Sequence, residues 1–160
     1  MNLKAVTGLA AAGLLWAGSA CAQVGPRDVV WVDEVTIPAS LTGVAGDPAA
    51  GFAAMENRGQ GNCYACHQVS ATPDVPFQGN IGPALDGVGS RWSEAELRGI
   101  IVDAKHMFPE TRMPSFYRID GFIRPGDGFT ARAANPETFG PLLNAQQVED
   151  VVAFLMTLTD

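Results

Sequence analysis

The sequence has few side chains that could bind a metal or act as a nucleophile, because its 160 residues include only three cysteines and two histidines. Basic residues are scarce as well: 10 Lys and Arg face 17 Asp and Glu, and the net charge of −7 argues against nucleic-acid binding. Beyond the amino terminus, no stretch approaches the roughly 18 consecutive apolar residues of a membrane span. No alternating pattern is long enough to indicate a sheet. We therefore expect one ordinary helical domain, with an acidic surface that favours partners carrying basic patches.

The amino terminus reads as a secretory signal peptide. Lys4 precedes an uncharged run over residues 5–17, and small residues follow up to Ala22. We predict that residues 1–22 are removed and that the mature protein is periplasmic, with a net charge of about −8 once Lys4 is lost. The alternative is a lipoprotein acylated at Cys21. That signal normally has a large aliphatic residue three positions before the cysteine, where this chain has Gly18.

The sequence Cys-Tyr-Ala-Cys-His over residues 63–67 predicts covalent haem attachment. In a C-x-x-C-H segment both thiols add to haem vinyl groups and the histidine binds iron, which assigns these roles to Cys63, Cys66 and His67. A redox dithiol or a zinc site is the alternative. Zinc needs four ligands, and His106 is the only other Cys or His left after cleavage. We expect one haem c and one-electron chemistry.

Three helices are predicted around this haem. One follows the N-cap Asp47 and runs over residues 48–58, a second opens at the capping box Ser93 to Glu96, and a third opens at Asn144. The third helix buries a stripe made of Val148, Val151, Val152 and Leu155. We therefore predict an all-α fold of the small class I cytochrome c type over residues 47–160, preceded by an N-terminal extension over residues 23–46.

The segment after the haem motif supplies further candidates. Residues 81–85 resemble the class I loop in which a proline carbonyl, here that of Pro83, accepts a hydrogen bond from the ligating imidazole. Leu85 would then pack on the porphyrin. Arg91 is a candidate for binding a haem propionate, or is a surface arginine, and Trp92 is a candidate for the wall of the haem site.

A second iron ligand is expected among the five methionines and the remaining histidine. Met113 precedes Pro114, which stiffens the loop, and this loop stands where class I cytochromes present their methionine. We take Met113 as the ligand, with core filler as the alternative. His106 and Met107 are the other options, but His106 lies at the polar end of its helix, where a histidine simply complements the helix terminus.

Three segments are more specific than these shared motifs: Pro-x-x-Leu-Thr-Gly at 38–43, Arg-Gly-x-Gly-Asn at 58–62 and Met-Pro-Ser-Phe-Tyr-Arg at 113–118. With residues 80–83 and 144–155 they resemble the SoxX family, the monohaem cytochromes of the bacterial sulfur-oxidising system. The similarity runs from about residue 35 to the end of the chain. Residues 103–109 and 121–142 depart from the family pattern.

The resemblance implies a partner and a reaction. SoxX pairs with the haem subunit SoxA, and the heterodimer oxidatively joins thiosulfate to a carrier-protein cysteine of SoxYZ. By resemblance this chain would accept electrons and pass them to a small cytochrome, and no catalytic acid, base or nucleophile is identified in it. The alternatives are a free cytochrome c serving an oxidase and, if Met113 does not bind iron, a haem that binds a small molecule.

The apolar extension over residues 23–46 bears on this choice. Residues 29–32 and 35–37 are more apolar than a solvated tail requires. The extension either docks on another subunit or forms a strand-like flap on the surface of its own domain.

Overall fold

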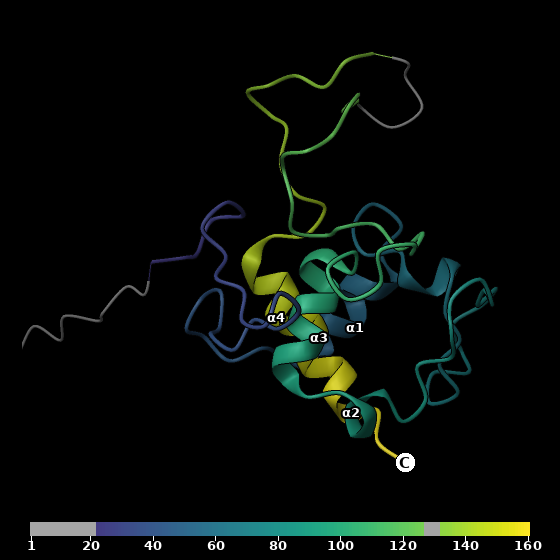
Figure 1. Ribbon diagram of the computed structural model, residues 1–160. Helices are drawn as coiled ribbons and strands as arrows, with labels where there is room; N and C mark the ends of the chain where they lie inside the picture. The colour runs from purple at the N-terminus through teal and green to yellow at the C-terminus, as the bar shows by residue number, and fades with distance from the viewer. Residues whose placement is uncertain (1–21, 127–131) are drawn as a thin grey trace, which may run out of the picture.

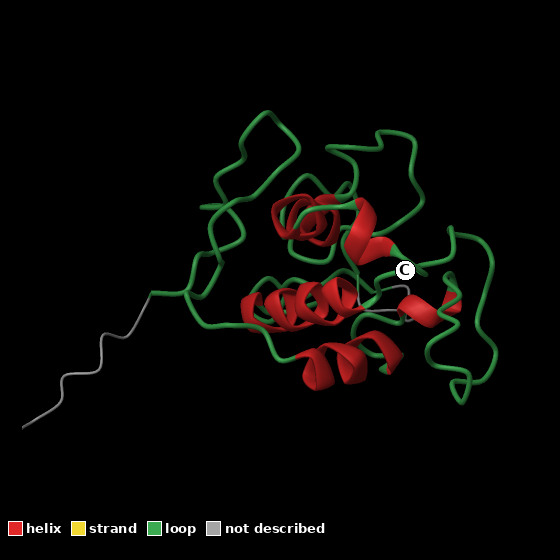
Figure 2. Ribbon diagram, turned by 90° about the horizontal axis from the view of Figure 1, so that it is seen from below, coloured by secondary structure: helices red, strands yellow, loops and turns green. Residues whose placement is uncertain are grey.

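The computed structural model describes residues 22–126 and 132–160. The predicted signal peptide lies outside the described residues except for Ala22. The described chain forms four α-helices and one 3-10 helix, and its only β-pairing is two isolated bridges. Figures 1 and 2 show the helices packed together, with long loops on either side. The elements are α1 (Pro48–Glu56), η1 (Cys63–Ala65), α2 (Val88–Arg91), α3 (Glu94–Asp103) and α4 (Ala145–Thr157).

The helix starts agree with the capping residues in the sequence. The Asp47 side chain accepts a hydrogen bond from the backbone N–H of Ala49, and the capping box between Ser93 and Glu96 is formed. Asn144 and Gln147 form a second capping box at the start of α4. The prediction for α1 was two residues too long, because the backbone is already extended at Asn57. The short helix α2 was not predicted.

The core lies where α4 meets α1 and α3 (Figure 1). The predicted stripe of α4 is buried at all four positions. Phe52 of α1 lies beside Phe154, with ring centroids 5.6 Å apart. The helices α1 and α4 approach so closely that a Cβ atom on Gly51 would lie 1.9 Å from the carbonyl oxygen of Asp150. Only glycine permits this approach.

A buried ion pair joins α3 to α4, and the sequence reading had not found it. The side chains of Arg98 and Glu149 are 2% and 4% exposed, and Arg98 Nη2 lies 2.9 Å from Glu149 Oε2. Arg98 Nη1 donates to the carbonyl oxygen of Ile37 at 2.8 Å, and Glu149 Oε1 accepts from the backbone N–H of Leu41 at 2.8 Å. Glu94, on the surface, also binds Arg98. The pair therefore holds residues of the N-terminal extension as well as two helices.

The extension packs on its own domain. Val32 and Thr36 form an antiparallel bridge, and the backbone N–H of Ile37 donates to the carbonyl of Ala95 in α3. Trp31 stacks on His106 with ring centroids 3.8 Å apart. In the single chain the extension therefore lies on the surface of its own domain. Its outer side still exposes Val30, which is 71% accessible.

A long loop leaves the body between Phe116 and Leu143, whose backbone N–H donates to the Phe116 carbonyl at 3.0 Å. We call its described residues, 119–126 and 132–142, the arm; Figure 1 shows it projecting well beyond the helices. Near its root Phe122 and Phe139 meet edge to face at 5.8 Å. No helix in the described part of the chain is long and apolar enough to cross a membrane.

Candidate haem site

The haem-attachment motif forms a tight turn at the start of the loop that faces away from the extension (Figures 1 and 2). Asn62 has a left-handed φ of 48°, and η1 begins at the next residue. The backbone N–H groups of Cys66 and His67 both donate to the carbonyl of Cys63 at 3.0 Å. Both cysteines are half-buried, and they form no disulfide with one another. The turn thus brings two thiols and an imidazole together within five consecutive residues.

The loop 79–85 runs alongside the haem motif and orients His67. Gly82 N–H donates to the Cys66 carbonyl, and Leu85 N–H to the Gln68 carbonyl. His67 Nδ1 lies 2.7 Å from the carbonyl oxygen of Pro83. A carbonyl oxygen can only accept, so Nδ1 carries the proton and the lone pair is on Nε2, the nitrogen that is left to bind a metal.

Close packing of this loop depends on two glycines that the sequence reading did not single out. A Cβ atom on Gly82 would lie 2.4 Å from Cε1 of the His67 ring, and one on Gly79 would lie 2.1 Å from the Ala65 carbonyl oxygen. Neither gap admits a side chain. The sequence signal for this close packing was the pair of glycines three residues apart, Gly79 and Gly82, directly before Pro83.

Met113 is half-buried and packs against the margin of the core. Its backbone N–H donates to Thr111 Oγ1 at 3.2 Å, and its carbonyl accepts from Lys105 Nζ at 2.8 Å. The residue is therefore fixed through both backbone groups, while Pro114 restricts the chain that follows.

Asp103, the last residue of α3, organises the methionine loop and was not among the predicted site residues. Its carboxylate accepts hydrogen bonds from Ser115 Oγ at 2.7 Å, Arg118 Nη1 at 2.9 Å and the Lys105 backbone N–H at 3.1 Å. Burial alone would raise the pKa of Asp103, but these hydrogen bonds outweigh it and hold the pKa below its usual value. Its place in the unusual stretch 103–109 was the only sequence signal.

The remaining predicted residues have different surroundings. Leu85 and Trp92 are half-buried and pack against the core, and Trp92 meets Phe108 edge to face at 6.1 Å. Arg91 is exposed, and its guanidinium donates to the carbonyls of Asp86 and Ala84. It therefore braces the loop that carries Pro83, which leaves fewer of its donors for a propionate.

The geometry disfavours the alternatives to haem. The described residues contain no cluster of three or more Cys, His, Asp or Glu side chains that could hold a metal ion. A redox dithiol needs a thiol with a lowered pKa, whereas burial raises the pKa of Cys63 to about 12. His106 is exposed, and its ring stacks on Trp31 of the extension, with ring centroids 3.8 Å apart.

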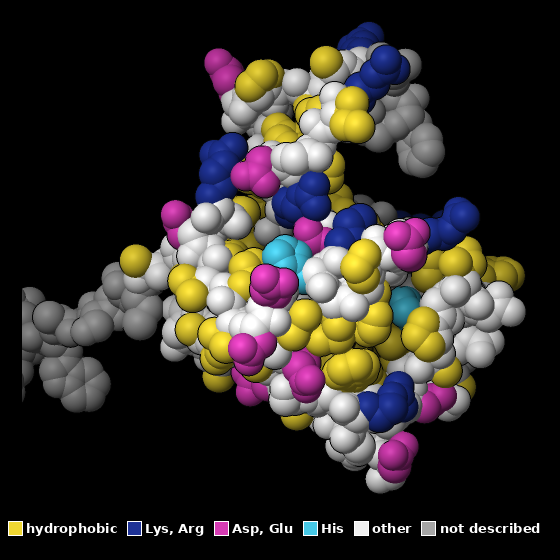
Figure 3. Space-filling model, in the orientation of Figure 1, with side chains coloured by type: hydrophobic (Ala, Val, Ile, Leu, Met, Phe, Trp, Pro, Cys, Tyr) yellow, Lys and Arg dark blue, Asp and Glu magenta, His cyan; other side chains and the backbone are white. Residues whose placement is uncertain are grey.

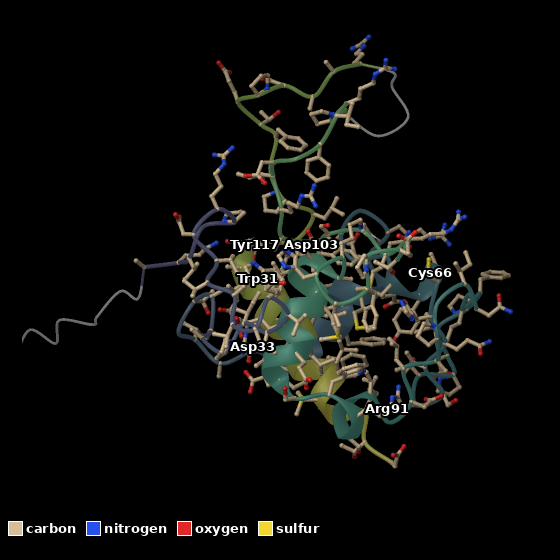
Figure 4. The ribbon with its side chains drawn as sticks, viewed as in Figure 1. Trp31, Asp33, Cys66, Arg91, Asp103 and Tyr117 are labelled. Atoms are coloured by element: carbon tan, nitrogen blue, oxygen red, sulfur yellow. The ribbon has the colours of Figure 1, made fainter. Side chains whose placement is uncertain are left out.

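The donors present fit a covalently bound haem. Two thiols stand beside an imidazole in the correct tautomer, and half-buried apolar side chains, Leu85 and Met113 among them, lie at the margin of the core. Figure 3 shows hydrophobic side chains gathered around a recess on the side where Figure 4 places Cys66, with a histidine among them. Such a set of groups defines a c-type cytochrome.

Comparisons with known proteins agree with this class. The family model described as cytochrome c matches residues 49–159, and the chain belongs to the cytochrome c family. One solved structure, titled "Crystal structure of SoxXA from P. pantotrophus", is 53% identical, with a TM-score of 0.82 over 87% of this chain and 100% of that one. No curated protein matches.

These findings confirm three predictions. The fold is the small all-α cytochrome fold with an N-terminal extension. The cofactor is one haem c, for which Cys63 and Cys66 have the required spacing. The chain is an electron-transfer cytochrome that resembles SoxX of SoxXA, as the sequence motifs indicated.

Proposed function

We propose that this protein is the periplasmic electron-transfer subunit of a SoxA-type heterodimer that oxidatively couples thiosulfate to a carrier-protein cysteine on SoxYZ. It accepts electrons from the partner haem subunit and passes them to a small cytochrome. His67 and Met113 would hold its haem iron. The domain spans residues 47–160, follows the extension 23–46, and is exported by a signal peptide over residues 1–22.

The observation that carries the electron-transfer part of this proposal is the orientation of His67 by Pro83, whereas the partner and the reaction rest on the similarity to the chain from SoxXA. The bond between Nδ1 and the carbonyl holds one tautomer, fixes the ring plane and makes Nε2 a better donor to iron. Bound haem supplies reversible one-electron transfer. The chain's own residues hold the imidazole ring of His67 in one orientation.

Met113 supports an electron carrier rather than an open haem. Its thioether would bind the haem iron together with His67, and it would favour a higher potential than a second histidine would. The loop that presents Met113 is ordered by hydrogen bonds on both sides of the residue. A fixed ligand keeps the iron surroundings similar in both oxidation states.

Two observations support a partner subunit. The similar solved structure is titled SoxXA, and all of the compared chain is covered by this one. The arm exposes apolar side chains, with Phe122, Ile123 and Leu142 accessible to 43%, 96% and 51%. Apolar groups gathered on a projecting segment are a frequent mark of a protein interface.

Ligation is tested by absorption spectroscopy of the haem-loaded protein. We expect the methionine-to-iron charge-transfer band in the wild type and its loss in Met113→Ala, with a high-spin ferric spectrum. Met107→Ala is the matched control from the same stretch and keeps the band. A high-spin spectrum in the wild type, or an unchanged band in Met113→Ala, overturns the assignment of Met113.

The complex is tested separately. The tagged chain is expected to co-purify from its source with a SoxA-type haem subunit, and deletion of its gene to abolish thiosulfate-dependent growth. Isolation only as a monomer, with growth unaffected, would identify a free cytochrome c instead. Amino-terminal sequencing of the exported protein should begin at Gln23; a chain that begins with acylated Cys21 would show lipidation.

A further inference from the structure

Asp103 occupies an unfavourable position for a carboxylate. It ends α3, where the helix dipole repels negative charge, and only 5% of its surface is accessible. Burying a charge without partners is strongly unfavourable. Nearby hydrogen-bond donors must therefore offset both the helix dipole and the cost of burial. These donors show which segments the Asp103 carboxylate holds together.

Two of its three donors follow Met113 in the chain. Ser115 and Arg118 bind the two different carboxylate oxygens, so the side chain spans the segment immediately after the methionine. The third donor is the backbone N–H of Lys105. Figure 4 places Asp103 at the end of α3 closest to the root of the arm, where this segment passes.

A residue just beyond the end of α3 also contacts the backbone of Met113. Lys105, whose backbone is bound to Asp103, donates from Nζ to the Met113 carbonyl at 2.8 Å. Backbone bonds from Phe116 and Tyr117 to the carbonyls of Ile101 and Val102 continue the attachment. The loop thus rests against one turn of helix, and Asp103 is the side chain that joins its parts.

We propose that Asp103 is a positioning residue for Met113: its carboxylate clamps residues 115–118 to the end of α3 and so keeps the methionine where it can bind iron. This rests on the proposed ligation by Met113. Removing the clamp raises the fraction of molecules in which the methionine has left the iron. A competing ligand binds only that fraction, so its apparent affinity measures the effect of the clamp.

The experiment is an imidazole titration of the haem-loaded, full-length ferric protein, followed through loss of the methionine-to-iron band. Hydrogen bonds to charged groups are among the stronger ones, so we expect Asp103→Ala to lower the apparent dissociation constant of imidazole about tenfold or more. Asp103→Asn keeps an acceptor for Ser115 but loses the charge that faces Arg118. Its apparent dissociation constant for imidazole should therefore lie between those of Asp103→Ala and the wild type.

Asp150→Asn is the matched control. Asp150 is also a buried carboxylate, 7% exposed, but it accepts from the backbone N–H of Asp47, the N-cap of α1, and from Gln146 within α4. This variant loses stability without contact to the methionine loop. We expect its melting temperature to fall while its imidazole constant stays within about twofold of the wild type.

Each outcome decides the proposal. If the Asp103 variants bind imidazole as the wild type and Asp150→Asn do, Asp103 is only structural and the proposal fails. If the Asp103 variants do not fold with haem, Ser115→Ala replaces them, because it removes only one of the three donors to Asp103. This variant must still raise the affinity for imidazole more than Asp150→Asn does. A wild type without the methionine band refutes the ligation itself, which is a different failure.

Discussion

Replacing Glu149 by Gln tests the buried ion pair most directly. The substitution preserves side-chain shape but removes the charge that faces Arg98, whose guanidinium is 2% exposed. Arg98 would keep its hydrogen bond to the Ile37 carbonyl and its ion pair with Glu94. The Glu94 side chain is 62% exposed, so water screens its charge. Breaking a buried pair by removing one partner typically costs about 3–5 kcal/mol. We expect a loss of this size in the free energy of unfolding.

The assay is urea denaturation of the haem-loaded protein followed by far-ultraviolet circular dichroism. With a slope of about 2 kcal/mol per molar, the midpoint should fall by about 1.5–2.5 M. Glu94→Gln is the control on the same arginine, and an exposed partner should contribute less than about 1 kcal/mol.

The double variant Arg98→Met, Glu149→Leu should recover much of the loss. It leaves no buried unpaired charge, although the Leu41 N–H loses its acceptor and the Ile37 carbonyl loses its donor. If Glu149→Gln lowers the midpoint no more than Glu94→Gln does, the reasoning from burial is wrong.

Three further predictions follow from individual residues. Gly51→Ala should lower stability by about 1–3 kcal/mol in thermal unfolding, because its Cβ would overlap the Asp150 carbonyl, whereas Gly140→Ala, with nothing within 4 Å, should be nearly neutral. Folding lowers the pKa of Asp103, so its charged form stabilises the protein at pH values above the ordinary pKa of a carboxyl group. This stabilisation should be lost as the pH falls through the lowered pKa. In unfolding measured as a function of pH, Asp103→Asn should lack this part of the acid dependence. Ile123→Asp should weaken co-purification with the partner subunit while leaving the haem spectrum unchanged; equal recovery of the partner would remove the arm from the interface.

The helices were predictable because their signals are local. Asp47, Ser93 and Asn144 each cap a helix through a neighbour at most three residues away, and the apolar stripe of α4 repeats with the helix period. The Arg98 pair was missed for the opposite reason. Its partner is 51 residues away, and a charged residue on a helix otherwise indicates a solvated face.

The site divides in the same way. The haem motif is contiguous, so Cys63, Cys66 and His67 follow from the sequence. The contact of His67 with Pro83 required a family loop as a guide, and the structure gives its distance. Asp103 lies ten residues before Met113 and resembles an ordinary helix terminus, so only the folded chain shows what its carboxylate holds.

The attachment of the extension also constrains when the protein can fold. Leu41 bonds to Glu149, 108 residues later, and Val24 bonds to Tyr117, 93 residues later. Only the bond from Leu41 needs α4, but each bond joins residues about a hundred positions apart. Contacts between such distant residues form slowly. Cys63 and Cys66 lie within the segment that these bonds close, so we expect both thiols to be easier to reach for haem attachment before the extension has docked than after it.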